Sequence, residues 1–313
     1  MKILEPPLIV QKSDMEDQWS RCLQTLEEHS SLVSSVSFSH DSKFLVSAAH
    51  DRTVKIWDTS SGDCLTTFEH NEPVRSTALS HDSKLLVQCI MTIENGGSDL
   101  LSSVVLYGPG CIICGSDNGT IKLWDTKSRE CFKILEGHSS AVSEITIAQN
   151  LGLLASASRD KTIKIWDLSS WKCVRTLDEH AAWVRSVVFS PDSQLLASGS
   201  LDHSIKIWNT DNWNCIRTID CDAARNPSSP YDWTESLAFS HDSKMLATGS
   251  KSFDIHLWNT SNGMLLQALN GHQGDIWSVA FSHDSKLLAS ASADETIRIW
   301  DATSTLNEIS SSP

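Results

Sequence analysis

Histidine, serine and aspartate recur in this sequence with the residue types that a hydrolase needs for a catalytic triad. A Ser–His–Asp triad uses them as nucleophile, general base and orienting acid. In this chain the set is followed by a tryptophan six residues after the aspartate, and it occurs four times: His29, Ser47, Asp51, Trp57; His138, Ser156, Asp160, Trp166; His180, Ser198, Asp202, Trp208; and His272, Ser290, Asp294, Trp300. An enzyme needs one triad, whereas a structural network is needed in every repeat. We therefore interpret the sets as structural and expect neither catalytic residues nor an enzyme.

Cysteines and other histidines suggest metal or redox chemistry, but packing explains each group better. Cys111 and Cys114 form a CxxC pair, yet alternation along a strand would send their side chains to opposite faces. Four cysteines stand seven residues after a repeat tryptophan and are expected to pack as small apolar groups: Cys64, Cys131, Cys173 and Cys215. Four histidines share one turn position and are expected to be too dispersed for one metal: His40, His81, His241 and His283. The sequence indicates neither a metal nor a cofactor.

Composition limits the classes of partner. The 313 residues contain 25 Lys and Arg against 39 Asp and Glu, a formal net charge of -14, which argues against binding to nucleic acid or to an anionic membrane. No apolar run is long enough to span a bilayer, so we expect no membrane insertion. The nine cysteines, with no export signal before them, are expected to be reduced thiols. We expect a cytoplasmic protein that is monomeric in isolation; a nuclear location is also compatible.

The elements that carry these residues form a repeat. Six β-rich runs end in tryptophan, spaced by 67, 42, 42, 50 and 42 residues, at Trp57, Trp124, Trp166, Trp208, Trp258 and Trp300. Phrases similar to FSHDSK open the other half of the unit, and their Asp-Ser pair favours a tight hairpin. Each unit is therefore predicted to contain four strands, a to d in chain order. In the unit ending at Trp166 the predicted strands are residues 142–147, 153–157, 162–167 and 172–177.

The interval of 67 residues predicts one incomplete unit, which we number 2. Residues 89–94, CIMTIE, match the fourth-strand phrases CLTTFE and CIRTID. Unit 2 is thus expected to have strands a, b and d and to lack strand c with its Trp-Asp. Two origins remain open for the 16 missing residues, a genuine deletion and a gene-model error. Counting this unit predicts seven.

Four-stranded units with two apolar flanks must stack, and closing the stack into a ring protects the edges. CLQTLEEH from Cys22 matches CLTTFEH from Cys64, so an N-terminal strand is expected to complete the last unit beside residues 296–301. A period of about 42 residues with Gly-His near its start and Trp-Asp near its end resembles the WD40 repeat. The resemblance covers residues 19–301 and implies an all-β, seven-bladed WD40 β-propeller. Residues 1–18 are expected to be a linker remnant and residues 302–313 a polar tail.

The same resemblance implies that the four His-Ser-Asp-Trp sets lock strands together by hydrogen bonds. It also implies that other proteins or peptides bind on the face that carries the d–a and b–c loops. Framework positions should recur between blades, whereas binding positions should differ. Tryptophan and arginine, which are enriched at binding hot spots, are prominent among the variable positions of this face: Trp183, Arg185, Trp233, Trp277, Arg159, Arg75, Asp275 and Glu235. The long loop from Asp220 in blade 6 is expected to overhang the same face.

The phrases WSRCLQTLEEHSSLVSSVSFSHDSK and SASRDKTIKIWDLSS resemble the WD-repeat domains of fungal NOD-like receptors of the vegetative-incompatibility type. In that family a NACHT nucleotide-binding domain precedes the propeller, which senses a ligand. The resemblance implies a non-catalytic interaction scaffold that acts as a sensor, or a stand-alone relative; whether an upstream NACHT domain belongs to the gene remains open. The alternative is an adapter in a multiprotein complex, of the mitochondrial-fission or ubiquitin-ligase substrate-receptor type.

Overall fold

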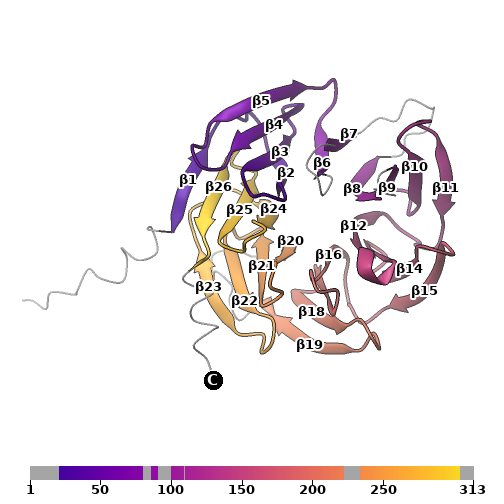
Figure 1. Cartoon of the computed structure of the whole chain (residues 1–313). Helices are drawn as coiled ribbons and strands as arrows, with labels where there is room; N and C mark the ends of the chain where they lie inside the picture. The colour runs from indigo at the N-terminus through magenta and orange to yellow at the C-terminus, as the bar shows by residue number, and fades with distance from the viewer. Residues whose placement is uncertain (1–20, 80–85, 91–99, 109, 222–232, 304–313) are drawn as a thin grey trace, which may run out of the picture.

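The computed structural model describes residues 21–79, 86–90, 100–108, 110–221 and 233–303, with the backbone alone for residues 86–90. Its sheets stand around a central channel, as the blades of a β-propeller do (Figure 1). The predicted linker remnant lies outside the described residues, as does the polar tail beyond Thr303. No helix in the described ranges is long and apolar enough to cross a membrane.

Six four-stranded blades are present in the described ranges, and we keep the unit numbers of the repeats. Blade 1 contains β2 (Val33–Phe38), β3 (Phe44–Ala49), β4 (Thr53–Asp58) and β5 (Cys64–Glu69). Blade 3 contains β8 (Leu101–Tyr107), β9 (Cys111–Ser116), β10 (Ile121–Asp125) and β11 (Cys131–Leu135). Blade 4 contains β12 (Val142–Ala148), the short 3-10 helix η1 (Gln149–Leu151), β13 (Leu153–Ser158), β14 (Ile163–Asp167) and β15 (Lys172–Leu177). These bounds of blade 4 confirm the predicted strands to within one residue.

The remaining blades follow the same antiparallel order. Blade 5 contains β16 (Val184–Phe189), β17 (Leu195–Ser200), β18 (Ser204–Asn209) and β19 (Cys215–Asp220). Blade 6 contains β20 (Thr234–Phe239), β21 (Met245–Ser250), β22 (Ile255–Asn259) and β23 (Leu265–Leu269). Blade 7 contains β24 (Ile276–Phe281), β25 (Leu287–Ser292), β26 (Ile297–Asp301) and β1 (Cys22–Leu26).

A two-stranded hairpin stands where blade 2 was expected, so the prediction of seven blades is not supported. It consists of β6 (Val74–Leu79) and β7 (Leu86–Ile90). The predicted strand d at residues 89–94 is wrong at its start, because Cys89 and Ile90 continue β7 and pair with Ser76 and Val74 of β6. A match to a fourth-strand phrase could not reveal this, since so short an apolar run is compatible with more than one strand of the unit. Residues 91–94 lie outside the described residues.

The a–b turns show why the Asp-Ser pair favours a hairpin. In blade 1, Asp41 Oδ1 accepts hydrogen bonds from Ser39 Oγ at 2.7 Å and from the Lys43 N–H at 3.2 Å. Ser42 can then adopt a left-handed backbone with φ of 59°, a conformation that costs non-glycine residues energy elsewhere. Ser193, Ser243 and Ser285 repeat this backbone conformation in blades 5, 6 and 7.

The apolar core lies between the faces of neighbouring blades. Trp208 of blade 5 packs in one cluster with Ala155, Ile163 and Ile165 of blade 4. Trp57 of blade 1 packs in the same way against blade 7, in another cluster. Because each tryptophan fills the interface with the preceding blade, no blade buries its core without a neighbour.

Hydrogen bonds also connect the innermost strands around the channel. A backbone N–H of one strand a donates to a side chain of the strand a before it: Val36 N to Ser278 Oγ (3.2 Å), Thr77 N to Ser35 Oγ (3.4 Å), Ile145 N to Ser103 Oγ (3.3 Å), Val187 N to Glu144 Oε2 (2.8 Å), Leu237 N to Ser186 Oγ (3.0 Å) and Val279 N to Ser236 Oγ (3.2 Å). One of these bonds, from Thr77 to Ser35, joins the β6–β7 hairpin to blade 1 and holds the hairpin in place.

The N-terminal strand closes the ring, as the sequence predicts. Strand β1 pairs antiparallel with β26, from Cys22 opposite Trp300 to Leu26 opposite Ile297. The Asp301 N–H also donates to the Arg21 carbonyl at 2.9 Å. Blade 7 is therefore built from both ends of the described chain, and its last edge is covered.

Deletion of residues 1–28 should destabilise the protein strongly, because it removes β1 and leaves the edge of β26 unpaired. We expect aggregation or a large fall in melting temperature, measured by differential scanning fluorimetry and light scattering. Deletion of residues 1–18, which keeps β1, is the matched control. Equal melting of the two truncated proteins would contradict the closure.

Candidate functional site

The four His-Ser-Asp-Trp sets each form a connected network. In blade 4, His138 Nδ1 lies 2.8 Å from Asp160 Oδ2, and His138 Nε2 lies 2.7 Å from Ser156 Oγ. The Trp166 Nε1–H donates to the same serine oxygen at 2.9 Å. Blades 1, 5 and 7 repeat the arrangement, with the corresponding distances between 2.7 and 2.9 Å. The structure thus brings all sixteen residues together in fours.

Burial determines what these networks can do. Ser156 has no exposed surface, so its hydroxyl cannot reach a substrate carbonyl as a triad nucleophile must. Burial lowers the pKa of His138. Burial alone would raise the pKa of Asp160, but hydrogen bonds from Thr162 and the interaction with His138 outweigh it and hold the pKa at about 2. A neutral imidazole between an ionised aspartate and a serine links strands b and c to the d–a loop.

Blades 3 and 6 depart from the network. In blade 6, Trp258 Nε1 donates to Thr248 Oγ1 at 3.0 Å in place of a serine. In blade 3, Cys114 and Asn118 occupy the serine and aspartate positions, and the buried Trp124 Nε1–H has no hydrogen-bond partner among the described residues. The ring therefore does not need a complete network in every blade.

The variant Asp160→Ala should lose about 1–3 kcal/mol of unfolding free energy, because it leaves buried donors on His138 and Thr162 unsatisfied. Denaturant unfolding followed by tryptophan fluorescence measures the loss. Asp211→Ala, which removes a carboxylate from an exposed turn, is the control. Equal stability of the two variants would show that the network does not lock the strands.

The a–b turns meet at one mouth of the channel, and there the structure corrects the interpretation of the turn histidines. The ring centroids of His40 and His283 lie 3.9 Å apart, and those of His241 and His283 lie 3.7 Å apart. They line a pocket of about 230 Å³. The expectation that they are dispersed is wrong for these three, because the a–b turns converge on the axis; His81 lies outside the described residues. No group of three or more His, Cys, Asp or Glu suited to a metal ion occurs in the described ranges.

The expected apolar packing of the four repeat cysteines is confirmed for Cys64 and Cys215, which pack against apolar clusters between blades. Cys64, Cys131, Cys173 and Cys215 lie on the outermost strands, and Cys173 is exposed. Their Sγ atoms contact the backbone carbonyl two residues later, for example Arg175 O at 3.2 Å. In the CxxC pair, Cys114 is buried while Cys111 is half-buried, and burial raises the pKa of Cys111 to about 11. A thiol with such a pKa is poorly suited to metal binding or redox exchange at neutral pH.

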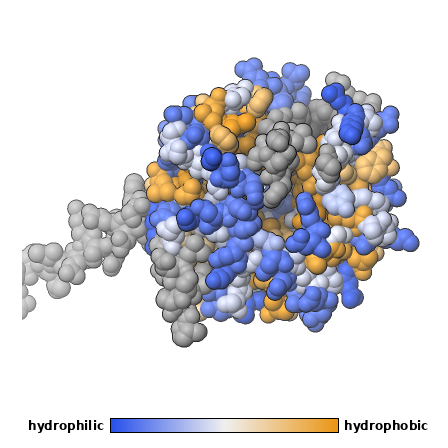
Figure 2. All heavy atoms as spheres, viewed as in Figure 1, coloured by the Kyte–Doolittle hydropathy of each residue, from blue (hydrophilic) through white to orange (hydrophobic). Residues whose placement is uncertain are grey.

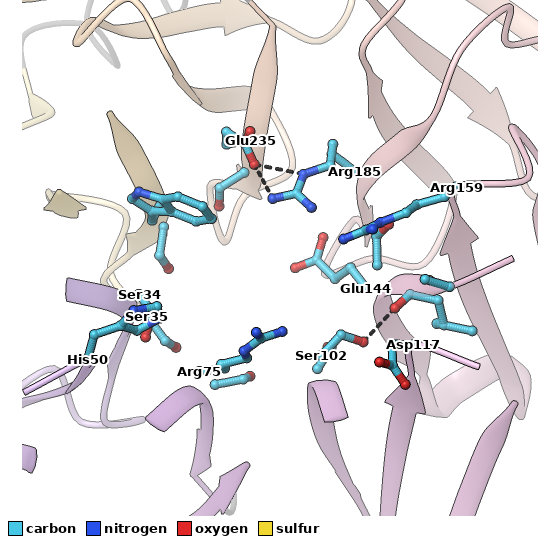
Figure 3. A pocket seen from close by; sticks show the side chains of 18 residues that line it. Ser34, Ser35, His50, Arg75, Ser102, Asp117, Glu144, Arg159, Arg185 and Glu235 are labelled. Carbon is cyan, nitrogen blue, oxygen red and sulfur yellow. Dashed lines mark hydrogen bonds and ion pairs between the residues drawn. The ribbon is translucent and has the colours of Figure 1, made fainter. Parts of the chain in front are cut away.

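A second pocket, of about 330 Å³, lies at the end of the channel where strands a begin and the b–c loops meet. We call it the channel pocket. Figure 3 shows Arg75 of the hairpin, Arg159 of blade 4 and Arg185 of blade 5 pointing into it, with Glu144 among them. Its lining is polar, with serines and ionisable groups from most of the blades and from the hairpin. In the view of Figure 2, apolar side chains gather toward the outer edge of the ring, and hydrophilic side chains cover much of the rest of the face.

Five of the predicted binding residues lie in one network of blades 5 to 7. Glu235, which is buried, accepts hydrogen bonds from Arg185 Nε at 2.7 Å and from Trp233 Nε1 at 2.7 Å. Lys251 lies 3.3 Å from Asp275 Oδ2, with its Nζ 5.1 Å from the centre of the Trp233 ring. Trp277 joins this network through the Arg185 guanidinium, 5.9 Å from its ring centre. These side chains support one another, and truncating them would disturb the fold as well as the surface.

Trp183 and Arg159 lie outside this network, and both are exposed. Trp183 is 44% exposed, and the Arg159 guanidinium lies 5.1 Å from the centre of its ring. Neither side chain of this pair has a hydrogen bond or ion pair among the described residues. The two form an exposed cation–π pair beside the channel pocket. The blade 6 loop expected to overhang this face falls in residues 222–232, outside the described residues.

The sequence analysis missed Glu144. It occupies the strand a position that is serine in the neighbouring blades, and its Oε2 accepts the Val187 N–H. Its burial among the inner strands raises its pKa to about 7, although hydrogen bonds from Ser186 and Val187 act in the opposite direction. Comparing repeat positions facing the channel, such as Ser35, Ser103 and Ser186, would have revealed this one carboxylate.

Glu144→Gln should alter the pH dependence of stability. Because the carboxyl pKa is higher in the folded chain than its ordinary value of 4.5, the unfolded chain loses its proton first as pH rises. The group's contribution to the unfolding free energy therefore falls between pH 4.5 and about 7. Glutamine loses no proton, so the variant should gain about 1–3 kcal/mol over wild type when pH is raised from about 5 to about 8.

Denaturant unfolding at the two pH values measures this gain. The exposed Glu130→Gln is the control, since it removes the same charge outside the channel. A difference between Glu144→Gln and wild type that does not change with pH would contradict the altered pKa.

The comparisons with known proteins identify the family. The model described as "WD domain, G-beta repeat" matches residues 20–58, 62–125, 129–167, 171–209, 229–259 and 263–301. Together with the radial four-stranded sheets, this shows that the chain belongs to the WD40 repeat family. Proteins of this family are typically non-catalytic scaffolds suited to protein–protein interaction.

Individual relatives match shorter stretches. The chain is 27% identical to mitochondrial division protein 1 of Kluyveromyces lactis over 131 residues, 42% of the chain and 18% of the relative. It is 50% identical to vegetative incompatibility protein HET-E-1 of Podospora anserina over 58 residues, 18% of the chain and 4% of the relative. It is 32% identical to coatomer subunit beta'-2 of Arabidopsis thaliana over 133 residues, 42% of the chain and 12% of the relative. Each match covers less than a fifth of the relative.

Proposed function

We propose that the chain is a non-catalytic scaffold that binds partner proteins on the face formed by its d–a and b–c loops. The observation that carries the proposal is the exposed Trp183–Arg159 pair beside the channel pocket. Tryptophan and arginine contribute disproportionately to protein binding. This pair has no hydrogen bond or ion pair among the described residues to keep it in place. The framework networks, by contrast, are buried and repeat from blade to blade.

Within this function, the chain acts as the ligand-sensing propeller of a fungal NOD-like receptor or as a stand-alone relative. The match to vegetative incompatibility protein HET-E-1, at 50% identity, supports this role. An adapter role is the alternative, and matches to mitochondrial division protein 1 over 42% of the chain support it. The two roles use the same face and differ in the partner.

The double variant Trp183→Ala/Arg159→Ala should lose the partners that wild type recovers from fungal lysate, because both hot-spot side chains are removed. Truncation of a hot-spot tryptophan costs about 2–4 kcal/mol of binding free energy. Thermal melting should change little, since neither side chain is buried. Quantitative mass spectrometry of the recovered proteins measures the loss.

The control variant carries His40→Ala, His241→Ala and His283→Ala at the opposite mouth of the channel. Loss of the same partners by the control alone would place binding on the opposite face. Equal recovery by wild type and both variants would also contradict the proposal. If the partners that wild type recovers are proteins of mitochondrial division, the adapter role is favoured over the sensor role.

A further inference from the structure

Each carboxyl group that lines the channel pocket already accepts at least one hydrogen bond from the fold. Both carboxylate oxygens of Glu235 accept hydrogen bonds, from Trp233 and from Arg185. Glu144 accepts the Val187 N–H, and Asp117 accepts the Leu100 N–H at 3.1 Å. The negative groups of the pocket are therefore held by the fold.

Several donors of the same pocket have no partner. Arg75 and Arg159 both line it, and neither guanidinium has a hydrogen bond or ion pair among the described residues. The Ser143 hydroxyl and the Trp277 Nε1–H are buried and also lack a hydrogen-bond partner within the described ranges. Buried donors without acceptors cost free energy. The cost is recovered when a ligand or water supplies acceptor atoms.

The charges around Arg75 leave it available. His50 is its near neighbour, and partial burial together with the Arg75 charge lowers the His50 pKa. The imidazole is therefore neutral at neutral pH and adds no charge beside Arg75. Figure 3 shows the Arg75 side chain pointing into the pocket, on the side away from the paired Arg185 and Glu235. Three arginines and three carboxyl groups line the pocket, and two of the arginines, Arg75 and Arg159, are left without a carboxylate partner among the described residues.

We infer that the channel pocket binds an oxyanion, a carboxylate or a phosphate, carried by an acidic peptide segment of the partner, with Arg75 and Arg159 as its principal ligands. The inference rests on the proposed function for the face on which the partner binds. Guanidinium groups form strong charge-assisted hydrogen bonds with both oxyanions. A pocket of about 330 Å³ accepts one such side chain rather than a folded domain. The acidic surface elsewhere repels an acidic segment, so recognition concentrates at this pocket.

Selection from a displayed library of random peptides of about ten residues tests the inference. Peptides enriched on wild type should share at least one acidic position. Their affinity, measured by fluorescence anisotropy, should fall at least tenfold on Arg75→Gln/Arg159→Gln. The control Lys133→Gln/Arg175→Gln removes two charges from the outer strands and should bind as wild type does.

Substituted peptides identify the source of the oxyanion. Replacing the shared acidic residue by asparagine should weaken binding at least tenfold. Replacing it by phosphoserine should preserve or strengthen binding when a phosphate is the preferred ligand, and should weaken it when the carboxylate is preferred.

The inference is overturned if no peptides are enriched, if the enriched peptides have no acidic position, or if Arg75→Gln/Arg159→Gln binds them as wild type does. Loss of peptide binding by Trp183→Ala together with full binding by Arg75→Gln/Arg159→Gln would separate the two proposals. The face would then bind partners as proposed, without an oxyanion in the channel pocket.

Discussion

The hydrogen bonds between neighbouring inner strands, together with the tryptophan packed in each interface, are the constraint on which the rest of the structure depends. No blade can cover both of its apolar faces, so each depends on its neighbours, and the last must meet the first. The pairing of β1 with β26 meets that requirement. The Thr77 to Ser35 bond holds the two-stranded hairpin in the series. A closed frame of this kind keeps the loops at the channel mouth in fixed positions.

Buried polar groups divide the chain into frame and surface. Each of the four complete networks pairs its buried histidine with an aspartate and a serine, because an unpaired member would destabilise the blade. Changing such a residue costs stability, and four of the six blades keep the complete set. Trp183 and Arg159 make no such frame contacts and are free to differ from blade to blade. The Ser143 hydroxyl and the Trp277 Nε1–H form an intermediate class, since they are buried as frame groups are and unpaired as ligand-binding groups are.

Repetition explains what the sequence could predict. Strand bounds in blade 4, the four networks and the closing strand all follow from positions that recur, and they agree with the structure. The β7 strand was assigned incorrectly at Cys89 because a single apolar phrase fits two strands equally well. Convergence of His283 with its neighbours depends on how the turns project toward the axis, which spacing along the chain does not encode. Likewise, the pairing of Trp233 and Arg185 with Glu235 depends on contacts between blades, so these residues could be identified as variable but not as mutually bound.

Amide hydrogen exchange of the full chain, with and without an acidic peptide obtained by selection, tests most directly whether the channel pocket is the binding site. Exchange reports local protection of each segment. The account predicts slower exchange on binding in the segments around the pocket, residues 73–76, 139–144, 158–160 and 181–186. Protection confined to the a–b turns at the opposite mouth, residues 39–43, 190–194, 240–244 and 282–286, would contradict it.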